Sequence, residues 1–228
     1  TSELDATRGV GLLAASRVGH RVVTGRPAGQ STLTFISSAG VATPLAASVP
    51  AGGVAEAAVN DAGAAVVAWI DGNILRVAAF DGTGWVTAEA GNGPFASLRV
   101  AIARDGTAMV AGTTGRVTAS VFGWWFSPRH GWESRPHAFA RHPLPSGVTP
   151  DVAVRVSGAA SVAWAGNDGR IVVGNRGTDG RWTGPQVIAI ERPRTVVRTA
   201  IAFDPSGRAL VAWTRNRDRR VVTRTRLT

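Results

Sequence analysis

The chain of 228 residues contains no cysteine, no tyrosine and no lysine. The absence of cysteine excludes a disulfide scaffold, a thiolate metal site and a cysteine nucleophile, and the absence of tyrosine excludes a tyrosine nucleophile. Glycine or arginine interrupts every apolar run before it reaches the roughly 18 residues that a membrane-spanning helix needs. Residues 1–8 carry two acids and lack the basic start of a signal peptide.

The residues that are present describe a globular protein. Apolar residues make up 44% of the chain and charged residues only 18%, a balance that predicts a folded core. All 25 basic residues are arginine, and the net charge is +10. This arginine-only composition, rich in alanine, valine and glycine, resembles that of exported proteins from high-GC bacteria. We therefore expect an extracellular or cell-surface location after removal of a leader, with a cytoplasmic location as the alternative.

An internal repeat of 43 to 52 residues runs along the chain. Its turn glycines are Gly19, Gly63, Gly106, Gly158 and Gly207. Alanine stands five residues before each glycine, valine four residues after it, and tryptophan or glycine six residues after it. The apolar patterns on both sides of each glycine predict a hairpin of two strands, and two further strands follow in the complete copies.

Four strands in a repeat of this length are typical of a β-propeller blade. We predict an all-β protein without helices: one domain, 1–228, that is a five-bladed β-propeller of four-stranded antiparallel blades. The blades are expected at about 9–48, 53–91, 97–145, 150–191 and 196–228. Residues 1–8 would complete the last blade, so that the N-terminal strand closes the ring and removes an open edge. The alternative is a five-blade part of a longer ring, completed by further sequence or by a second chain.

Two segments, 178–182 and 209–213, resemble the blades of bacterial sialidase-like propellers. Those blades often carry an Asp box, Ser/Thr-x-Asp-x-Gly-x-x-Trp, between their third and fourth strands, and residues 81–85 (Asp-Gly-Thr-Gly-Trp) are a compressed form of it. In its five-bladed plan the chain is also similar to tachylectin-like sugar-binding propellers and to five-bladed furanosidases. The sialidase resemblance implies a tyrosine nucleophile, so the absence of tyrosine excludes a retaining sialidase mechanism.

The resemblance to furanosidases implies carboxylates at the mouth of the central tunnel. The position seven residues before the turn glycine is expected near that mouth, and it holds Glu56, Arg99 and Asp151 in the second, third and fourth copies. The two acids could act as a catalytic pair with Arg99 as an anchor for substrate. The alternative is a structural ion-pair cluster that closes the funnel.

The loops expected on one face of the propeller are basic. They hold nine arginines and four acids, a net charge of +5, whereas the turns on the opposite face balance to zero. The six arginines proposed there as ligand-binding residues are Arg26, Arg116, Arg170, Arg215, Arg217 and Arg219. Such a face attracts anions, and the arginine fork suits carboxylates and phosphates. The alternative is arginine enrichment by codon usage on a solvated surface. Because no nucleic-acid-binding module is present, nucleic acid is not the expected partner.

The third copy is longer than the others and rich in aromatic residues between positions 121 and 142. Because sugar rings stack on tryptophan, Trp124 and Trp125 are candidates for a carbohydrate platform. The alternative is that they pack in the core, at an outer edge or in a dimer contact. Three histidines of this segment are spaced by seven and five residues, unlike a compact zinc motif, so we predict no metal site and no cofactor.

These features together predict a non-catalytic module that binds glycans, acidic or neutral, or anionic polymers through its basic loops and its Trp-rich loops. Two alternatives stay open: a glycoside hydrolase or lyase that uses the carboxylates at the tunnel mouth, and a scaffold for protein partners. The expected partner is a glycan or an anionic polymer, and no membrane span is expected.

Overall fold

The computed structural model describes residues 11–25, 30–50, 54–115, 120–141, 149–193, 196–215 and 221–226. These residues form twenty β-strands and no helix, which confirms the prediction of an all-β protein. A helix able to cross a membrane is accordingly not found in this part of the chain. The predicted closing strand, residues 1–8, lies outside the described residues.

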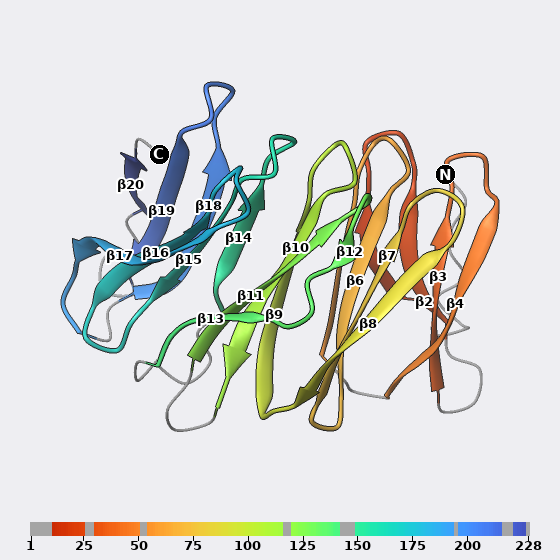
Figure 1. Ribbon diagram of the computed structural model, residues 1–228, viewed down its shortest axis with the longest axis horizontal. Helices are drawn as coiled ribbons and strands as arrows, with labels where there is room; N and C mark the ends of the chain where they lie inside the picture. The colour runs from red at the N-terminus through yellow and green to blue at the C-terminus, as the bar shows by residue number, and fades with distance from the viewer. Residues whose placement is uncertain are drawn as a thin grey trace.

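The strands form five antiparallel sheets, one for each repeat (Figure 1). The first sheet contains β1 (Gly11–Ala15), β2 (Arg21–Gly25), β3 (Gln30–Ile36) and β4 (Ala42–Pro50). The second contains β5 (Ala55–Val59), β6 (Ala65–Asp71), β7 (Ile74–Phe80) and β8 (Trp85–Asn92). The third contains β9 (Phe95–Ile102), β10 (Ala108–Thr114), β11 (Ser120–Ser127), β12 (Gly131–Trp132) and β13 (His137–Arg141). The fourth contains β14 (Asp151–Val154), β15 (Ala160–Ala165), β16 (Arg170–Arg176) and β17 (Trp182–Ile190), and the fifth contains β18 (Val196–Phe203), β19 (Ala209–Arg215) and β20 (Val221–Arg226).

A glycine closes the first hairpin of every sheet. The five repeat glycines have φ angles between 83° and 97°, a left-handed conformation that costs other residues about 1–2 kcal/mol. In each of these turns the glycine N–H donates to the carbonyl oxygen three residues before it, as Gly106 does to Ala103 at 3.1 Å. The glycine repeat of the sequence therefore marks the points at which the chain reverses.

The core consists of four apolar layers, each between two successive sheets. The valine four residues after the repeat glycine faces the preceding sheet: Val67 shares a layer with Leu33 and Phe35. The residue just before this valine faces the next sheet, as Val66 does toward Trp124. Because both faces of the second, third and fourth sheets are covered, strands β6, β10 and β15 are buried along almost their whole length and do not alternate with polar residues.

The five sheets lie side by side along the longest axis of the molecule (Figure 1). The sheet of β1–β4 and the sheet of β18–β20 stand at opposite ends of this row, so closure into a five-bladed ring is not confirmed. The predicted four strands are present in the first, second and fourth sheets. In the third sheet the outer strand is divided, because β12 and β13 both pair with β11, and the fifth sheet has three described strands.

The compressed Asp box forms the turn between β7 and β8, and its two glycines differ in backbone conformation. Gly82 has a φ of 102°, Gly84 has no such angle, and a Cβ added at either glycine would meet nothing within 4 Å. We therefore expect Gly82→Ala to lower the free energy of unfolding by about 1–2 kcal/mol and Gly84→Ala to change it by less than about 0.5 kcal/mol. Urea denaturation of the two variants measures the difference, and equal stabilities would contradict the prediction.

Candidate functional site

The predicted catalytic residues lie on the first strands of three successive sheets. Glu56 is on β5, Arg99 on β9 and Asp151 on β14. The Glu56 carboxylate accepts a hydrogen bond from Nη1 of Arg99, and Oδ2 of Asp151 accepts one from the backbone N–H of Ile201 at 2.8 Å. Each carboxylate is thus bonded to the inner strand of the next sheet. These contacts fit the structural alternative, in which the charged residues join neighbouring sheets.

A pocket of about 260 Å³ opens beside two of these residues. Arg99 and Asp151 line it together with Arg198. Glu56, the other half of the predicted acid pair, does not line this pocket. Arg99 thus bonds to Glu56 and lines a pocket with Asp151, and the two carboxylates do not line one described pocket together.

Trp124 and Trp125 belong to the core. Their side chains are 1% and 4% exposed, and they lie in two different apolar layers, because neighbouring residues of β11 point to opposite faces of the third sheet. The indole N–H of Trp124 donates to the backbone carbonyl of Glu133 at 2.8 Å. Neither ring offers an exposed face to a sugar, which corrects the ligand-binding role proposed for them and agrees with the alternative of core packing.

The predicted basic face is balanced in its described part. Arg170 pairs with Asp168 at 3.1 Å, and Arg215 pairs with Glu191 at 3.4 Å. Arg192 and Asp71 complete the described charges of these loops, which are three arginines and three acids. The excess of positive charge in the sequence therefore falls on residues outside those that the structure describes. Four of the predicted ligand-binding residues are among them: Arg26, Arg116, Arg217 and Arg219.

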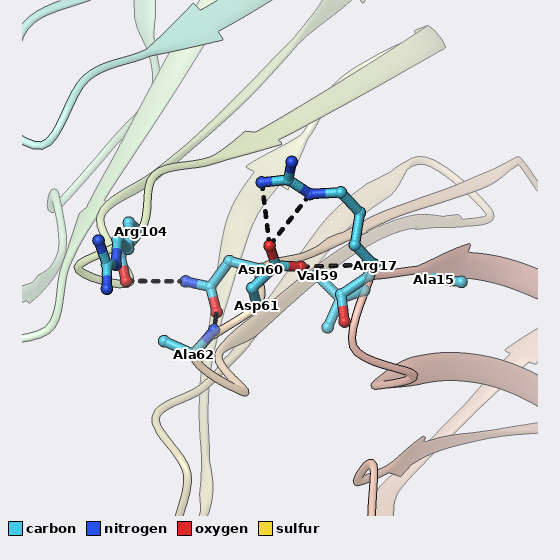
Figure 2. Close-up of a pocket in the computed structure, with 8 residues that line it drawn as sticks. Ala15, Arg17, Val59, Asn60, Asp61, Ala62 and Arg104 are labelled. Carbon is cyan, nitrogen blue, oxygen red and sulfur yellow. Dashed lines mark hydrogen bonds and ion pairs between the residues drawn. The ribbon is translucent and has the colours of Figure 1, made fainter.

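A polar pocket of about 580 Å³ lies at the hairpin turns of the first three sheets (Figure 2). Asp61 accepts hydrogen bonds from the backbone N–H and from Nε of Arg17, at 3.0 and 3.2 Å. The Asn60 amide donates to the carbonyl oxygens of Ala103 and Arg104, at 2.8 and 3.2 Å. Figure 2 shows the bonds of Arg17 with Asp61 and of Asn60 with Arg104 across the gaps between sheets, and a bond from the Ala62 N–H to Asn60 within one turn. The polar residues of this pocket are best explained as structural, because their hydrogen bonds join the turns of neighbouring sheets.

Tryptophans on the outer strands mark a different kind of contact between sheets. The indole N–H of Trp85 donates to the carbonyl oxygen of Thr43 at 3.4 Å, and that of Trp132 donates to the carbonyl oxygen of Val86 at 3.3 Å. Each bond joins a sheet to the preceding one. In the fourth sheet the corresponding indole, Trp182, donates to the side-chain Oε2 of Glu133 at 3.3 Å. A carboxylate thus stands at this gap where the other two gaps have a backbone carbonyl.

This carboxylate lies in a pocket between the third and fourth sheets, called here the Trp182 pocket, with a volume of about 550 Å³. Its lining residues are Glu133, Ser134, Arg135, Pro136, His137, Ala138 and Trp182. The His137 imidazole stacks on the Trp182 indole with ring centroids 4.8 Å apart and planes inclined by only 4°. Residues 133–136 connect the two halves of the divided outer strand, so the extra length of the third repeat builds one wall of the pocket.

Neighbouring residues hold the Trp182 pocket in shape. A Cβ at Gly123 would lie 2.9 Å from Cη2 of Trp182, so the glycine lets the indole approach the backbone of β11. Nε of Arg176 donates to Oε1 of Glu133 at 3.2 Å, and its guanidinium lies 4.3 Å from the ring centroid of Trp125. Both oxygens of the Glu133 carboxylate are therefore oriented by neighbours.

Burial lowers the pKa of His137 below its usual value of 6.5, and the negative charge of Glu133 opposes part of this effect. The imidazole is consequently neutral at pH 7. A neutral imidazole has one nitrogen that donates a hydrogen bond and one that accepts. The pocket wall thus combines an aromatic stack with a carboxylate and an imidazole, groups that can bond to hydroxyls.

Sequence reasoning did not select Glu133, His137 or Trp182. Trp182 was visible as a tryptophan that follows an Asp-Gly turn, and His137 as one of three histidines in the lengthened repeat. The signal for a site was the insertion itself, because it adds polar residues to an outer strand next to a repeat tryptophan. Trp124 and Trp125, the candidates chosen from the sequence, lie in the same repeat as Glu133 and His137, but their own side chains are buried.

No protein-family model matches the chain, and no curated protein matches it in sequence. Solved structures do match its fold. A lectin from Burkholderia pseudomallei has a TM-score of 0.58 at 17% identity, over 95% of this chain and 70% of that chain. A triple arginine mutant of AofleA from Arthrobotrys oligospora has a TM-score of 0.55 at 16% identity, over 95% and 68%. An asparagine-to-glutamine mutant of the Aleuria aurantia lectin in complex with Fucα1-6GlcNAc has a TM-score of 0.52 at 12% identity, over 95% and 74%.

These TM-scores show a shared fold, that of lectin-type β-propellers. They confirm the propeller prediction at this coarse level, with the blade number and the closure of the ring not confirmed. They do not confirm the predicted resemblance to sialidase-like propellers or its Asp box.

Proposed function

We propose that the protein is a non-catalytic glycan-binding module and that the Trp182 pocket is its binding site. The stacked pair of His137 and Trp182 beside the Glu133 carboxylate carries this proposal. A sugar ring has a face of C–H groups, which packs on aromatic rings, and a rim of hydroxyls, which needs fixed hydrogen-bonding partners. The volume of the pocket, about 550 Å³, lies within the usual range for small-ligand sites.

A neutral sugar suits this pocket, because the lining holds one acid, Glu133, and one arginine, Arg135, and so carries no excess charge. The Glu133 carboxylate accepts hydrogen bonds from hydroxyls but repels a second carboxylate at short range. The structures that share this fold include the Aleuria aurantia lectin in complex with α-methyl-L-fucoside. This likeness supports an L-fucoside as the first neutral sugar to be tested.

The test is a titration with α-methyl-L-fucoside and a panel of neutral monosaccharides, followed by intrinsic tryptophan fluorescence. We expect saturable binding that weakens at least about tenfold in Glu133→Gln and in Trp182→Phe, because each variant removes a charge-assisted or oriented hydrogen-bonding group. Trp85→Phe is the matched control: it makes the same substitution at the corresponding position of the second sheet, where the indole bonds to a carbonyl oxygen.

Two outcomes would overturn the proposal. One is the absence of binding to every neutral sugar in the panel. The other is equal weakening by Trp85→Phe and Trp182→Phe, which would mean that the tryptophans act only through the packing of the sheets. Thermal denaturation of all three variants checks that a loss of binding does not come from unfolding.

We further propose that the arginine-rich loops attract anionic polymers. The support is the sequence charge of +10 and the set of Arg26, Arg116, Arg217 and Arg219 on loops of the same predicted face. Exposed charges are screened within about 8 Å at physiological salt, so binding of an anionic polysaccharide should weaken steeply as salt is added. Binding of a neutral sugar at the Trp182 pocket should not depend on salt.

A further inference from the structure

Another pocket lies between the fourth and fifth sheets. Two positions of the repeat that hold buried apolar residues in the first three sheets hold polar residues there. In the first three sheets the residue three positions after the repeat glycine is apolar and lies on the second strand. The residue directly opposite it on the third strand is also apolar, and both side chains are buried. These pairs are Val22 with Phe35, Val66 with Ala79, and Met109 with Trp125. In the fourth sheet the corresponding pair is Ser161 on β15 and Asn175 on β16.

The polar pair is built into the structure. Ser161 is only 1% exposed, and its hydroxyl donates to Oδ1 of Asn175 at 2.7 Å. A buried hydroxyl without a hydrogen bond is costly, so this bond stabilises the serine and fixes the amide. Because Oδ1 faces Ser161, the amide nitrogen is the part of Asn175 that can donate to a ligand.

Around this pair lies a pocket of about 480 Å³ with two arginines and no acid among its lining residues. The residues that matter here are Arg155, Ser161, Asn175, Arg176, Gln186 and Phe203. It differs from the Trp182 pocket, in which a carboxylate faces the ligand space. Because Arg176 is already paired with Glu133, Arg155 is the charge in this pocket that favours an anionic ligand. The hydroxyl and amide groups suit a ligand with hydroxyls.

Arg155 is held in place by the fifth sheet. Its Nη1 donates to the carbonyl oxygen of Gly207 at 3.3 Å, and its guanidinium lies 5.6 Å from the ring centroid of Phe203. A Cβ added at Gly207 would collide with this guanidinium, so the glycine provides the space that Arg155 occupies. A guanidinium has five N–H donors in a planar fork, more than this one contact requires.

We propose that this pocket binds a carboxylate-bearing sugar, with Arg155 on the carboxylate, the amide of Asn175 on a ring hydroxyl, and the Phe203 ring against the apolar face of the sugar. Arginine pairs with carboxylates through two parallel hydrogen bonds, which favours a carboxylate over a neutral group at the same position. The proposal does not depend on the one for the Trp182 pocket, because Arg155, Asn175 and Phe203 lie at a different gap between sheets and do not line the Trp182 pocket.

The experiment is a titration of the whole chain with sodium D-glucuronate, followed by amide chemical shifts in two-dimensional NMR. D-glucose, which lacks the carboxylate, and sodium acetate, which lacks the ring, are the ligand controls. We expect saturable shifts at Ser161, Asn175 and Phe203 with glucuronate, and at least about tenfold weaker binding of either control. Shifts confined to other residues, or equal shifts with acetate, would overturn the proposal.

The double variant Ser161→Val, Asn175→Ala gives the fourth sheet the apolar pair that the second sheet has, and it should fold because that pair is already accommodated there. We expect it to lose glucuronate binding, whereas Trp182→Phe should keep it. If the double variant does not fold, Arg155→Met takes its place, with at least about tenfold weaker binding expected. Retained glucuronate binding in the folded variant would rule out this pocket as the glucuronate site. It would leave the proposal that the Trp182 pocket binds neutral sugars unchanged.

Discussion

Trp124→Ala is expected to lower the free energy of unfolding by about 3–5 kcal/mol, the cost usual for removing a large aromatic side chain from a core. The side chain is 1% exposed and packs between the second and third sheets with Val66, Val110 and Phe126. Its indole N–H also donates to the carbonyl oxygen of Glu133, which would lose a partner in the variant. Since small domains are stable by only about 5–15 kcal/mol, this loss is a large part of the total.

Urea denaturation, with the transition followed by circular dichroism, measures this loss. Ile190→Ala is the control, because Ile190 is 73% exposed and its truncation should change stability by less than about 0.5 kcal/mol. Trp124→Phe keeps an aromatic ring and should cost less than Trp124→Ala, so it serves if the alanine variant does not fold. An alanine variant of unchanged stability that had lost glycan binding would restore the sugar-platform interpretation of this residue.

The sequence was sufficient to predict the strands and the turns. Glycines that need a positive φ recur at one position of each repeat, and valines that fill the layers between sheets follow at a fixed distance. These features act locally or between neighbouring sheets, so a period along the chain reveals them. Closure of the ring is different. It depends on small rotations that add up from sheet to sheet, and no residue pattern of the repeat specifies their sum.

The candidate site was harder to predict because it depends on which surfaces other sheets cover. Two adjacent tryptophans, Trp124 and Trp125, suggested a platform for a sugar. They lie on β11 of the third sheet, both faces of which are covered, and their side chains point to opposite faces, so both are buried. The net charge of the loops was likewise counted without regard to ion pairs, and Arg170, for example, is paired with Asp168. Glu133 gained its role only because the third and fourth sheets bring it to Trp182, 49 residues away in the chain.

Arg176 is the residue whose removal should disturb both proposed sites. It lines the pocket between the fourth and fifth sheets, and its Nε donates to Glu133 in the Trp182 pocket at 3.2 Å. Its side chain is 12% exposed, its Nη1 donates to the carbonyl oxygen of Gly158 at 3.3 Å, and its guanidinium stacks on Trp125. Removing one partner of a fully buried ion pair costs about 3–5 kcal/mol, and this pair is only partly buried. We therefore expect Arg176→Met to lower the free energy of unfolding by about 2–3 kcal/mol.

A double-mutant cycle separates the ion pair from the other contacts of Arg176. In the Glu133→Gln background the carboxylate is gone, so Arg176→Met should cost less than in the wild type, by a coupling energy of about 0.5–3 kcal/mol. Urea denaturation of the four proteins gives this energy. Additive costs would mean that the stacking on Trp125 and the hydrogen bond to Gly158 hold the guanidinium without help from Glu133. In that case Glu133 would be oriented only by Trp182, and Arg176→Met would leave sugar binding at the Trp182 pocket intact. A coupled pair instead predicts that Arg176→Met weakens that binding as well, because the carboxylate loses the contact that fixes its Oε1.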